Sequence, residues 1–161
     1  MRFPRTIRLD ASDVQVFPAA AAPGEWAVPG SFAFAGMDPA VLSGKQRQAF
    51  TSGFLGLMSF GWSTLVIVSD IAADELNILQ ERLTTALLER YGAPNRAAAE
   101  AATAAETAFA ADLCEHKLNT LIALQRSLGP EGIVESFRLI DAPRGAMHAR
   151  IWEIVAGPHD D

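Results

Sequence analysis

Cysteine is nearly absent from this sequence of 161 residues, since Cys114 is the only one. A single cysteine cannot form a disulfide within the chain, so the composition suits a reducing compartment. Basic residues are also few, because 13 Lys and Arg stand against 19 Asp and Glu and give a net charge of −6. Nucleic-acid phosphates attract Lys and Arg, so we expect no nucleic-acid partner.

Long hydrophobic runs are missing too. Residues 51–69, which lie within the longest uncharged stretch, approach the length of a membrane span, yet glycine, serine and threonine interrupt them repeatedly. The segment 1–13 carries three arginines but lacks the apolar core of a secretory signal. We therefore expect a cytoplasmic protein that does not associate with membranes.

The remaining composition is that of a globular protein. Half of the residues are hydrophobic, which excludes a disordered chain, and the sequence lacks the repeats or heptads of a fibrous one. A chain of this length buries about two thirds of its unfolded surface, which is enough for one hydrophobic core. We expect residues 1–161 to form a single domain with a frayed tail at 157–161.

Short extended segments are predicted in the first third of the chain. Apolar residues alternate with other residues in four places, which is typical of strands. These places are residues 7–9, 14–17, 26–28 and 32–34. Pro29 has no N–H to donate, so the last two segments are expected at a sheet edge or in a bent hairpin.

A first helix is predicted after this region. Residues 43–46, Ser-Gly-Lys-Gln, have the spacing of a capping box, in which each outer side chain satisfies a free backbone N–H at the start of a helix. We expect this helix to bury Phe50 and Phe54 and to end near Gly53 or Gly56.

The middle of the chain predicts a buried strand and then two helices. Residues 64–69 form a β-branched run that is typical of a central strand covered on both faces, and Asp70 is expected to cap the helix that follows. Leucines recur at helical spacing through 72–91, ahead of a stop at Gly92. The segment 95–115 predicts a second helix because alanine, its main component, has the highest helix propensity.

The last third predicts strands again. Residues 119–128 and 133–140 flank the sequence Gly-Pro-Glu-Gly, which predicts an antiparallel hairpin, and a final strand with Trp152 is expected at 149–155. Helices do not alternate strictly with strands along the chain. The sequence therefore predicts an α+β fold, with an antiparallel or mixed sheet of about six strands and three helices packed against it.

Catalytic and metal-binding motifs find little support. The glycine spacing of residues 56–63 is that of a phosphate-binding loop, but Trp62 stands where the lysine is needed. Cys114 and His116 lie two residues apart, so on a helix they point in different directions, and zinc needs four ligands. We expect no catalytic residue, no metal and no cofactor.

Aromatic residues gather between positions 26 and 62. One interpretation is that they form half of the hydrophobic core. The other is a partly open apolar pocket or protein-docking surface with a basic rim, since Trp and Arg are enriched at such places. The candidate residues for this binding surface are Trp26, Lys45, Arg47, Phe60 and Trp62.

The same region carries a family resemblance. Residues 24–28 (GEWAV), 32–39 (FAFAGMDP), 44–45 (GK), 53–56 (GFLG) and 59–65 (SFGWSTL) resemble DUF6505, a bacterial family of unknown function. The resemblance covers most of the chain and brings no catalytic residues with it. It implies an accessory role, because such proteins resemble accessory factors encoded near molybdenum-enzyme maturation and lipoate-ligase-like proteins.

Three functions follow from these observations. We expect first a non-catalytic cytoplasmic domain that binds a protein partner, as an assembly or maturation factor. The alternative is a small-molecule-binding protein or enzyme with an aromatic-lined pocket, which would need converging polar groups. The third is a homodimer whose interface uses the alanine-rich helix.

Overall fold

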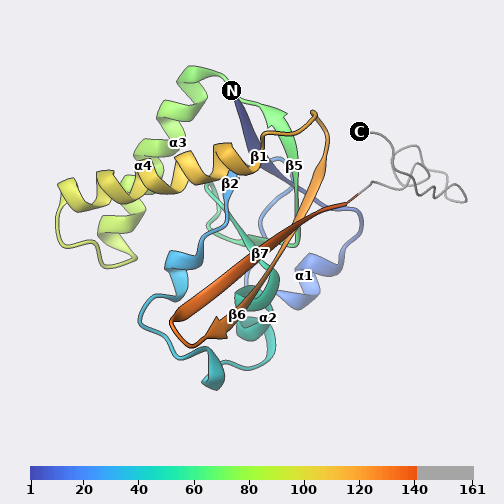
Figure 1. Ribbon diagram of the computed structural model, residues 1–161, viewed down its shortest axis with the longest axis vertical. Coiled ribbons are helices and arrows are strands. Elements are labelled where there is room, and N and C mark those ends of the chain that lie inside the picture. Colours follow the sequence, from blue (N-terminus) through green and yellow to red (C-terminus); the bar gives the residue numbers. More distant parts are fainter. Residues whose placement is uncertain (141–161) are drawn as a thin grey trace, which may run out of the picture.

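Strands and helices follow one another irregularly in the computed structural model, which describes residues 1–140 (Figure 1). The elements, with η for a 3-10 helix, are β1 (Arg2–Ile7), α1 (Ser12–Val16), β2 (Ala27–Val28), η1 (Ser31–Phe34), η2 (Pro39–Val41), α2 (Gly44–Ser52), β3 (Phe54–Gly56), β4 (Trp62–Ser63), β5 (Leu65–Asp70), α3 (Ala73–Glu89), α4 (Arg96–Leu113), β6 (Leu121–Gly129) and β7 (Gly132–Ile140). The expected strand at 149–155 and the expected frayed tail at 157–161 lie outside the described residues.

Two antiparallel sheets are built from these strands. The larger sheet has the order β1-β5-β6-β7 and the smaller one β2-β3-β4. A bridge between Arg5 and Trp26 joins the free edge of β1 to the segment that leads into β2, so the two sheets adjoin. The predicted α+β class is confirmed, although the strands form two sheets and number seven within residues 1–140.

The hairpin and the two long helices are where the sequence predicts them. β6 pairs antiparallel with β7 from Leu121 opposite Ile140 to Gly129 opposite Gly132. α3 and α4 are each shorter than predicted by a residue or two at either end. Asn95 caps α4, since its side chain accepts a hydrogen bond from the N–H of Ala98. None of the helices within residues 1–140 has the length and apolar character to cross a membrane.

Several of the short predicted strands are wrong. The first strand lies at 2–7 rather than 7–9. Residues 12–16 form α1, in which the buried carboxylate of Asp13 accepts hydrogen bonds from the backbone N and Oγ1 of Thr64. Residues 31–34 form η1 after Gly30 turns the chain with a φ of +82°. An alternation of three or four residues is too short to exclude a helical turn.

The predicted caps and one predicted strand environment are also corrected. α2 begins at Gly44 as predicted, but the Ser43 side chain makes no cap hydrogen bond. Asp70 ends β5 opposite Arg2 instead of capping α3, where Glu75 accepts from the N–H of Ala72. β5 lies between β1 and β6, and its residues alternate between buried and half-buried, so only one of its faces is fully covered.

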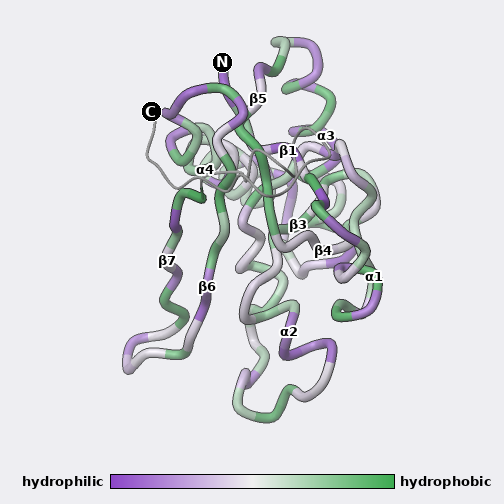
Figure 2. Tube along the Cα trace, turned by 90° about the vertical axis from the view of Figure 1, so that its right-hand side faces the viewer, coloured by the Kyte–Doolittle hydropathy of each residue, from purple (hydrophilic) through white to green (hydrophobic). Residues whose placement is uncertain are grey.

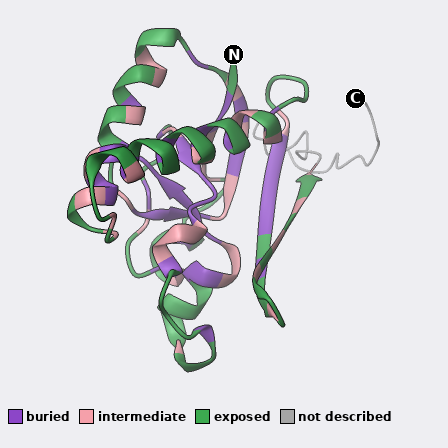
Figure 3. Ribbon diagram, turned by 60° about the vertical axis from the view of Figure 1, so that its left-hand side comes forward, coloured by how far each residue is buried: buried purple, intermediate pink, exposed green. Residues whose placement is uncertain are grey.

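Two clusters of buried side chains form the core. Figure 3 shows buried strands beneath the exposed outer surface of α4. The larger cluster joins the helices to the smaller sheet, and its members include Val28, Leu55, Leu57, Leu79, Leu83, Leu87, Ala99 and Ala110. The other lies against the larger sheet and consists of Ala27, Phe54, Val66, Val68, Cys114, Ile122 and Leu124. Figure 2 shows the β6–β7 hairpin and α2 directed toward the same end of the molecule.

A buried arginine holds this hairpin against the rest of the fold. The Arg126 side chain is fully buried and pairs with Glu135 on β7 at 2.8 Å. Its guanidinium also donates to the backbone oxygens of Phe50 at 3.0 Å, of Ala49 at 3.3 Å and of Pro29. One side chain of the larger sheet thereby binds the end of α2 and the segment after β2.

We expect Arg126→Ala to lower the free energy of unfolding by about 3–5 kcal/mol, because removing one partner of a buried ion pair leaves the other charge uncompensated. The matched control is Arg138→Ala, which removes an exposed arginine from the same hairpin and should change stability by about 0.5 kcal/mol or less. Urea denaturation of both variants measures the difference, and equal midpoints would show that Arg126 does not join the elements.

A half-buried carboxyl group on α4 makes stability depend on pH. Glu106 on α4 accepts a hydrogen bond from the N–H of Gly30 at 3.1 Å, and burial raises its pKa above the ordinary value. A carboxyl whose pKa is higher in the folded state binds its proton more tightly there, so folding is penalised as pH rises through the folded pKa.

Glu106→Gln keeps an acceptor for Gly30 and removes the titration. We expect the free energy of unfolding of this variant, relative to the wild type, to increase as pH rises above about 4.5, the usual pKa of a glutamate. Denaturation at several pH values between about 4 and about 7 measures it. Glu131→Gln, at an exposed turn position, is the control, and a constant difference between Glu106→Gln and wild type would contradict the prediction.

Candidate functional site

The structure separates the five residues that the sequence suggests as a binding surface. Lys45 and Arg47 are exposed on α2, where Arg47 donates to the backbone oxygens of Leu42 and Ala40 in the preceding loop. Trp62 on β4 is only 8% exposed and stacks on Phe34, with ring centroids 5.2 Å apart. Trp62 is therefore part of the core, and the two hollows that Trp26 and Phe60 line do not include Lys45 or Arg47.

Trp26 and Phe60 reach the surface on the same side of α3, and each is covered by an arginine. The Arg5 guanidinium lies 4.4 Å from the ring centroid of Trp26. The Arg90 guanidinium lies 5.1 Å from that of Phe60. Cations in this position are attracted to the negative face of the ring, so each arginine is held at a defined place.

Two hollows connect these aromatic residues along α3. The smaller, of about 270 Å³, is lined by Arg5, Gly24, Glu25, Trp26, Leu57, Met58, Glu75, Ile78, Leu79 and Arg82. The larger, of about 510 Å³, is lined by Phe60, Ile78, Glu81, Arg82, Thr85, Ala86, Glu89 and Arg90. Ile78 and Arg82 line both hollows, so we treat them as one site, the α3 groove.

The loop between β3 and β4 forms one wall of the α3 groove and is clamped from two sides. The buried carboxylate of Glu25 accepts hydrogen bonds from the N–H groups of Met58 at 3.0 Å and Ser59 at 2.8 Å. Arg82 on α3 donates to the backbone oxygens of Leu57 at 3.0 Å and Met58 at 2.9 Å. Neither residue carries a sequence signal, because each acts on a loop more than 20 positions away.

Close packing fixes the same loop. A Cβ at Gly56 would lie 2.5 Å from the Oε1 of Glu25, so only glycine lets the carboxylate reach the loop. Phe60 has a φ of +56°, in the left-handed region that bulky residues rarely adopt. Because of this turn, Phe60 is partly exposed although Trp62, only two positions later, is buried in the core.

The middle of the α3 groove is apolar and open. Met58 is 62% exposed and Ile78 is 63% exposed, and both line the smaller hollow beside Trp26. Exposed apolar side chains scattered singly over a surface need no explanation. Here two of them adjoin two partly buried aromatic residues, which is typical of a binding surface.

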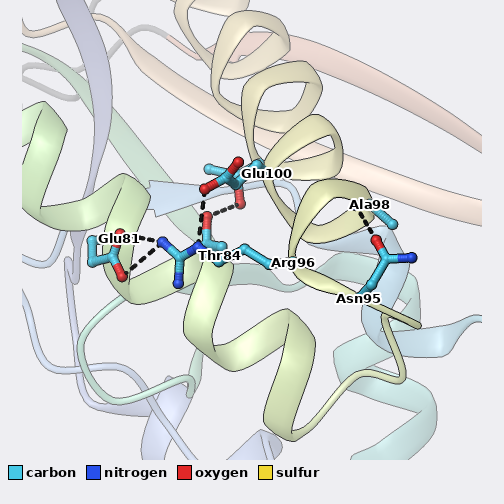
Figure 4. A network of polar contacts seen from close by, with 7 residues as sticks. Glu81, Thr84, Asn95, Arg96, Ala98 and Glu100 are labelled. Atoms are coloured by element: carbon cyan, nitrogen blue, oxygen red, sulfur yellow. Dashed lines mark hydrogen bonds and ion pairs between the residues drawn. The ribbon is translucent and has the colours of Figure 1, made fainter.

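The acidic residues of the groove are largely occupied. Glu81 is bound by Arg96, whose Nη2 lies 2.8 Å from the carboxylate, and Arg96 also pairs with Glu100 at 2.9 Å (Figure 4). The hydrogen bonds that Arg96 donates to the carboxylates of Glu81 and Glu100 raise the pKa of Arg96. The polar seam between α3 and α4 continues with a bond between the hydroxyls of Thr84 and Thr103 at 2.8 Å.

The Cys114 thiol, which the sequence analysis considers as a metal ligand, does not line the α3 groove. Cys114 is fully buried beside the larger sheet, and burial raises the pKa of its thiol to about 12. The thiol is therefore protonated at neutral pH and is a poor nucleophile. Within residues 1–140, no three His, Cys, Asp or Glu side chains gather as metal ligands.

Comparison with known proteins gives one match. The model of a family described as "Family of unknown function (DUF6505)" matches residues 1–153. No curated protein and no solved structure matches the chain.

Truncating the two neighbouring aromatic residues should separate the core from the groove. We expect Trp62→Ala to lower the free energy of unfolding by about 3–5 kcal/mol, because it leaves a cavity beside Phe34. Phe60→Ala should cost clearly less, because Phe60 is only partly buried. Chemical denaturation measures both variants. An equal or greater loss for Phe60→Ala would show that Phe60 belongs to the core, as Trp62 does.

Proposed function

This chain belongs to the DUF6505 family, whose function is unknown, and we propose that it is a non-catalytic accessory domain that binds a protein partner in the α3 groove. The observation that carries the proposal is the exposed pair Met58 and Ile78 between two aromatic rings that arginines cover. Protein interfaces are enriched in aromatic residues, Met and Arg, and their binding energy is concentrated in a few such anchors.

The clamped loop supports the same function. Glu25 and Arg82 fix the backbone of the loop from opposite sides, and Arg5 and Arg90 are held against aromatic rings. A surface that is ordered before binding loses less conformational entropy on association, which increases affinity. We propose that the protein is an assembly or maturation factor in the cytoplasm, where a lone thiol stays reduced. This preorganised surface would be the site at which it docks its partner.

A small-molecule site is the second candidate. The larger hollow, at about 510 Å³, falls within the range of about 300–1,000 Å³ that ligand pockets occupy. Its extent argues for a protein partner instead, because Ile78 and Arg82 join it to the smaller hollow in one surface that runs along α3 from Trp26 to Phe60. Ligand pockets are concave sites that enclose most of a small ligand. A second copy of the chain is a further partner that the experiment below can detect.

The test compares variants of the tagged protein purified from its own cells. Met58→Ala combined with Ile78→Ala removes the apolar centre of the groove without adding charge. Val41→Ala is the matched control, since Val41 is 75% exposed and lies on η2 outside the groove. Exposed substitutions change stability by about 0.5 kcal/mol or less, so all variants should keep the wild-type melting curve.

We expect mass spectrometry to find a protein that co-purifies with wild type and Val41→Ala and is lost from the double variant. Titration of that purified protein should then show a loss of about tenfold or more in affinity, which is the size of one interface anchor. Equal binding to the double variant would contradict the proposal. Recovery of the chain itself as the groove-dependent partner would identify a homodimer.

A further inference from the structure

We propose that the segment bound in the α3 groove is acidic, with Asp or Glu side chains on either side of an apolar residue; this inference rests on the proposed function. The chemistry of this segment follows from the hydrogen-bond donors that the arginines of the groove leave unused.

Arg5 and Arg90 each keep N–H donors that no other described residue binds. Arg5 gives its Nε–H to the backbone oxygen of Gly24 at 2.8 Å and lies over Trp26, and within residues 1–140 its two Nη groups have no carboxylate partner. Arg90 lies over Phe60 and Tyr91 and forms no ion pair with a described residue. These guanidinium groups are fixed in place but remain able to bind a carboxylate, which they do with two parallel hydrogen bonds.

Arg82 completes a row of three arginines. It binds two backbone oxygens of the loop through Nε and Nη2, which leaves the Nη1 group and the positive charge for a ligand. A backbone oxygen orients a guanidinium but carries no full charge to neutralise it. Arg82 lines both hollows, between Arg5 in the smaller one and Arg90 in the larger one.

The oxygens of the carboxylates in the groove, by contrast, are mostly occupied as hydrogen-bond acceptors. Glu25 is buried and accepts from three backbone N–H groups, those of Ala22, Met58 and Ser59. Glu75 accepts from the N–H of Ala72, and Glu81 forms the ion pair with Arg96 that Figure 4 shows. Backbone donors orient Glu25 and Glu75 without neutralising them, so the groove leaves hydrogen-bond donors unused rather than a net positive charge. Among the acidic residues that line the groove, Glu89 is the one without such a contact in the described chain. The surface therefore offers free donors and few free acceptors.

The spacing of the arginines indicates the pattern of the segment. Arg82 lies on α3 and Arg90, eight positions later, is its C-cap, which separates them by about 12 Å along the helix axis. An extended chain covers that distance with about four residues. Two carboxylates at this spacing would reach both guanidinium groups, and an apolar residue near the first of them would contact Ile78 and Met58.

Because the net charge of the protein is negative, nonspecific electrostatic attraction would not select acidic peptides. With a net charge of −6, the whole molecule attracts basic peptides and repels acidic ones at long range. Selection of acidic peptides would therefore have to come from the local arrangement of arginines.

The experiment selects peptides from a random displayed library on four forms of the protein. These are the wild type, Arg90→Gln, Arg138→Gln and the double variant Met58→Ala/Ile78→Ala. Arg90→Gln removes one guanidinium from the groove, and Arg138→Gln is the matched control, because it makes the same change on β7 outside both hollows. Arg90 and Arg138 are both exposed, so melting curves should not change.

We expect wild type to select peptides in which Asp or Glu flank an apolar residue. A synthetic peptide of the selected sequence should bind Arg90→Gln about tenfold more weakly, which corresponds to one lost charge-assisted hydrogen bond, and Arg138→Gln as tightly as wild type. Binding to the double variant should be lost.

Other outcomes separate the two proposals. Basic or uncharged peptides that still require Met58 and Ile78 would overturn the acidic segment and leave the α3 groove as a docking site. Peptides that bind the double variant as well as wild type, or a library without any groove-dependent binder, would overturn both the acidic segment and the proposed use of the groove.

Discussion

The rest of the structure depends on the burial of one guanidinium group. Arg126 brings a full charge into the interior, where it must be compensated, and the compensating groups come from three separate parts of the chain: Glu135 on β7, the carbonyls at the end of α2, and that of Pro29 after β2. Because each of these groups has to meet the guanidinium at hydrogen-bond distance, the hairpin, α2 and the smaller sheet are fixed relative to one another. The rings of Phe34 and Trp62 close this site at 5.6 and 5.9 Å from the guanidinium carbon.

This constraint divides the aromatic region in two. Trp62 is held in the core next to Arg126, while the left-handed turn at Phe60 separates it from the exposed residues of the loop beside α3. The buried carboxylate of Glu25 fixes the backbone of that loop from one side, and Arg82 fixes it from α3. The α3 groove is thus a consequence of two buried polar groups, one that sets the sheets and one that sets the loop.

The chemistry of the groove supports the proposed role in binding a protein partner. Arg5 and Arg90 lie against aromatic rings, Glu81 is paired with Arg96, and the centre of the groove is apolar and exposed. The thiol of Cys114 is buried beside the larger sheet, and burial raises its pKa to about 12, so it is a poor nucleophile. A partner that supplies an apolar residue and carboxylates would satisfy the groups that the fold leaves open.

The sequence by itself determined the α+β class, α3, α4 and the β6–β7 hairpin, because helical leucine spacing, alanine content and a Gly-Pro-Glu-Gly turn are local signals that need no distant contact. It also pointed to the aromatic region, and two of its five candidate residues, Trp26 and Phe60, do border the α3 groove. Only the tertiary structure decided that Trp62 is buried and that Lys45 and Arg47 lie apart on α2. It alone revealed Arg126, Glu25 and Arg82, because each binds backbone groups 24 or more positions away, and a hydrogen bond to a distant backbone group leaves no periodicity or motif in the sequence.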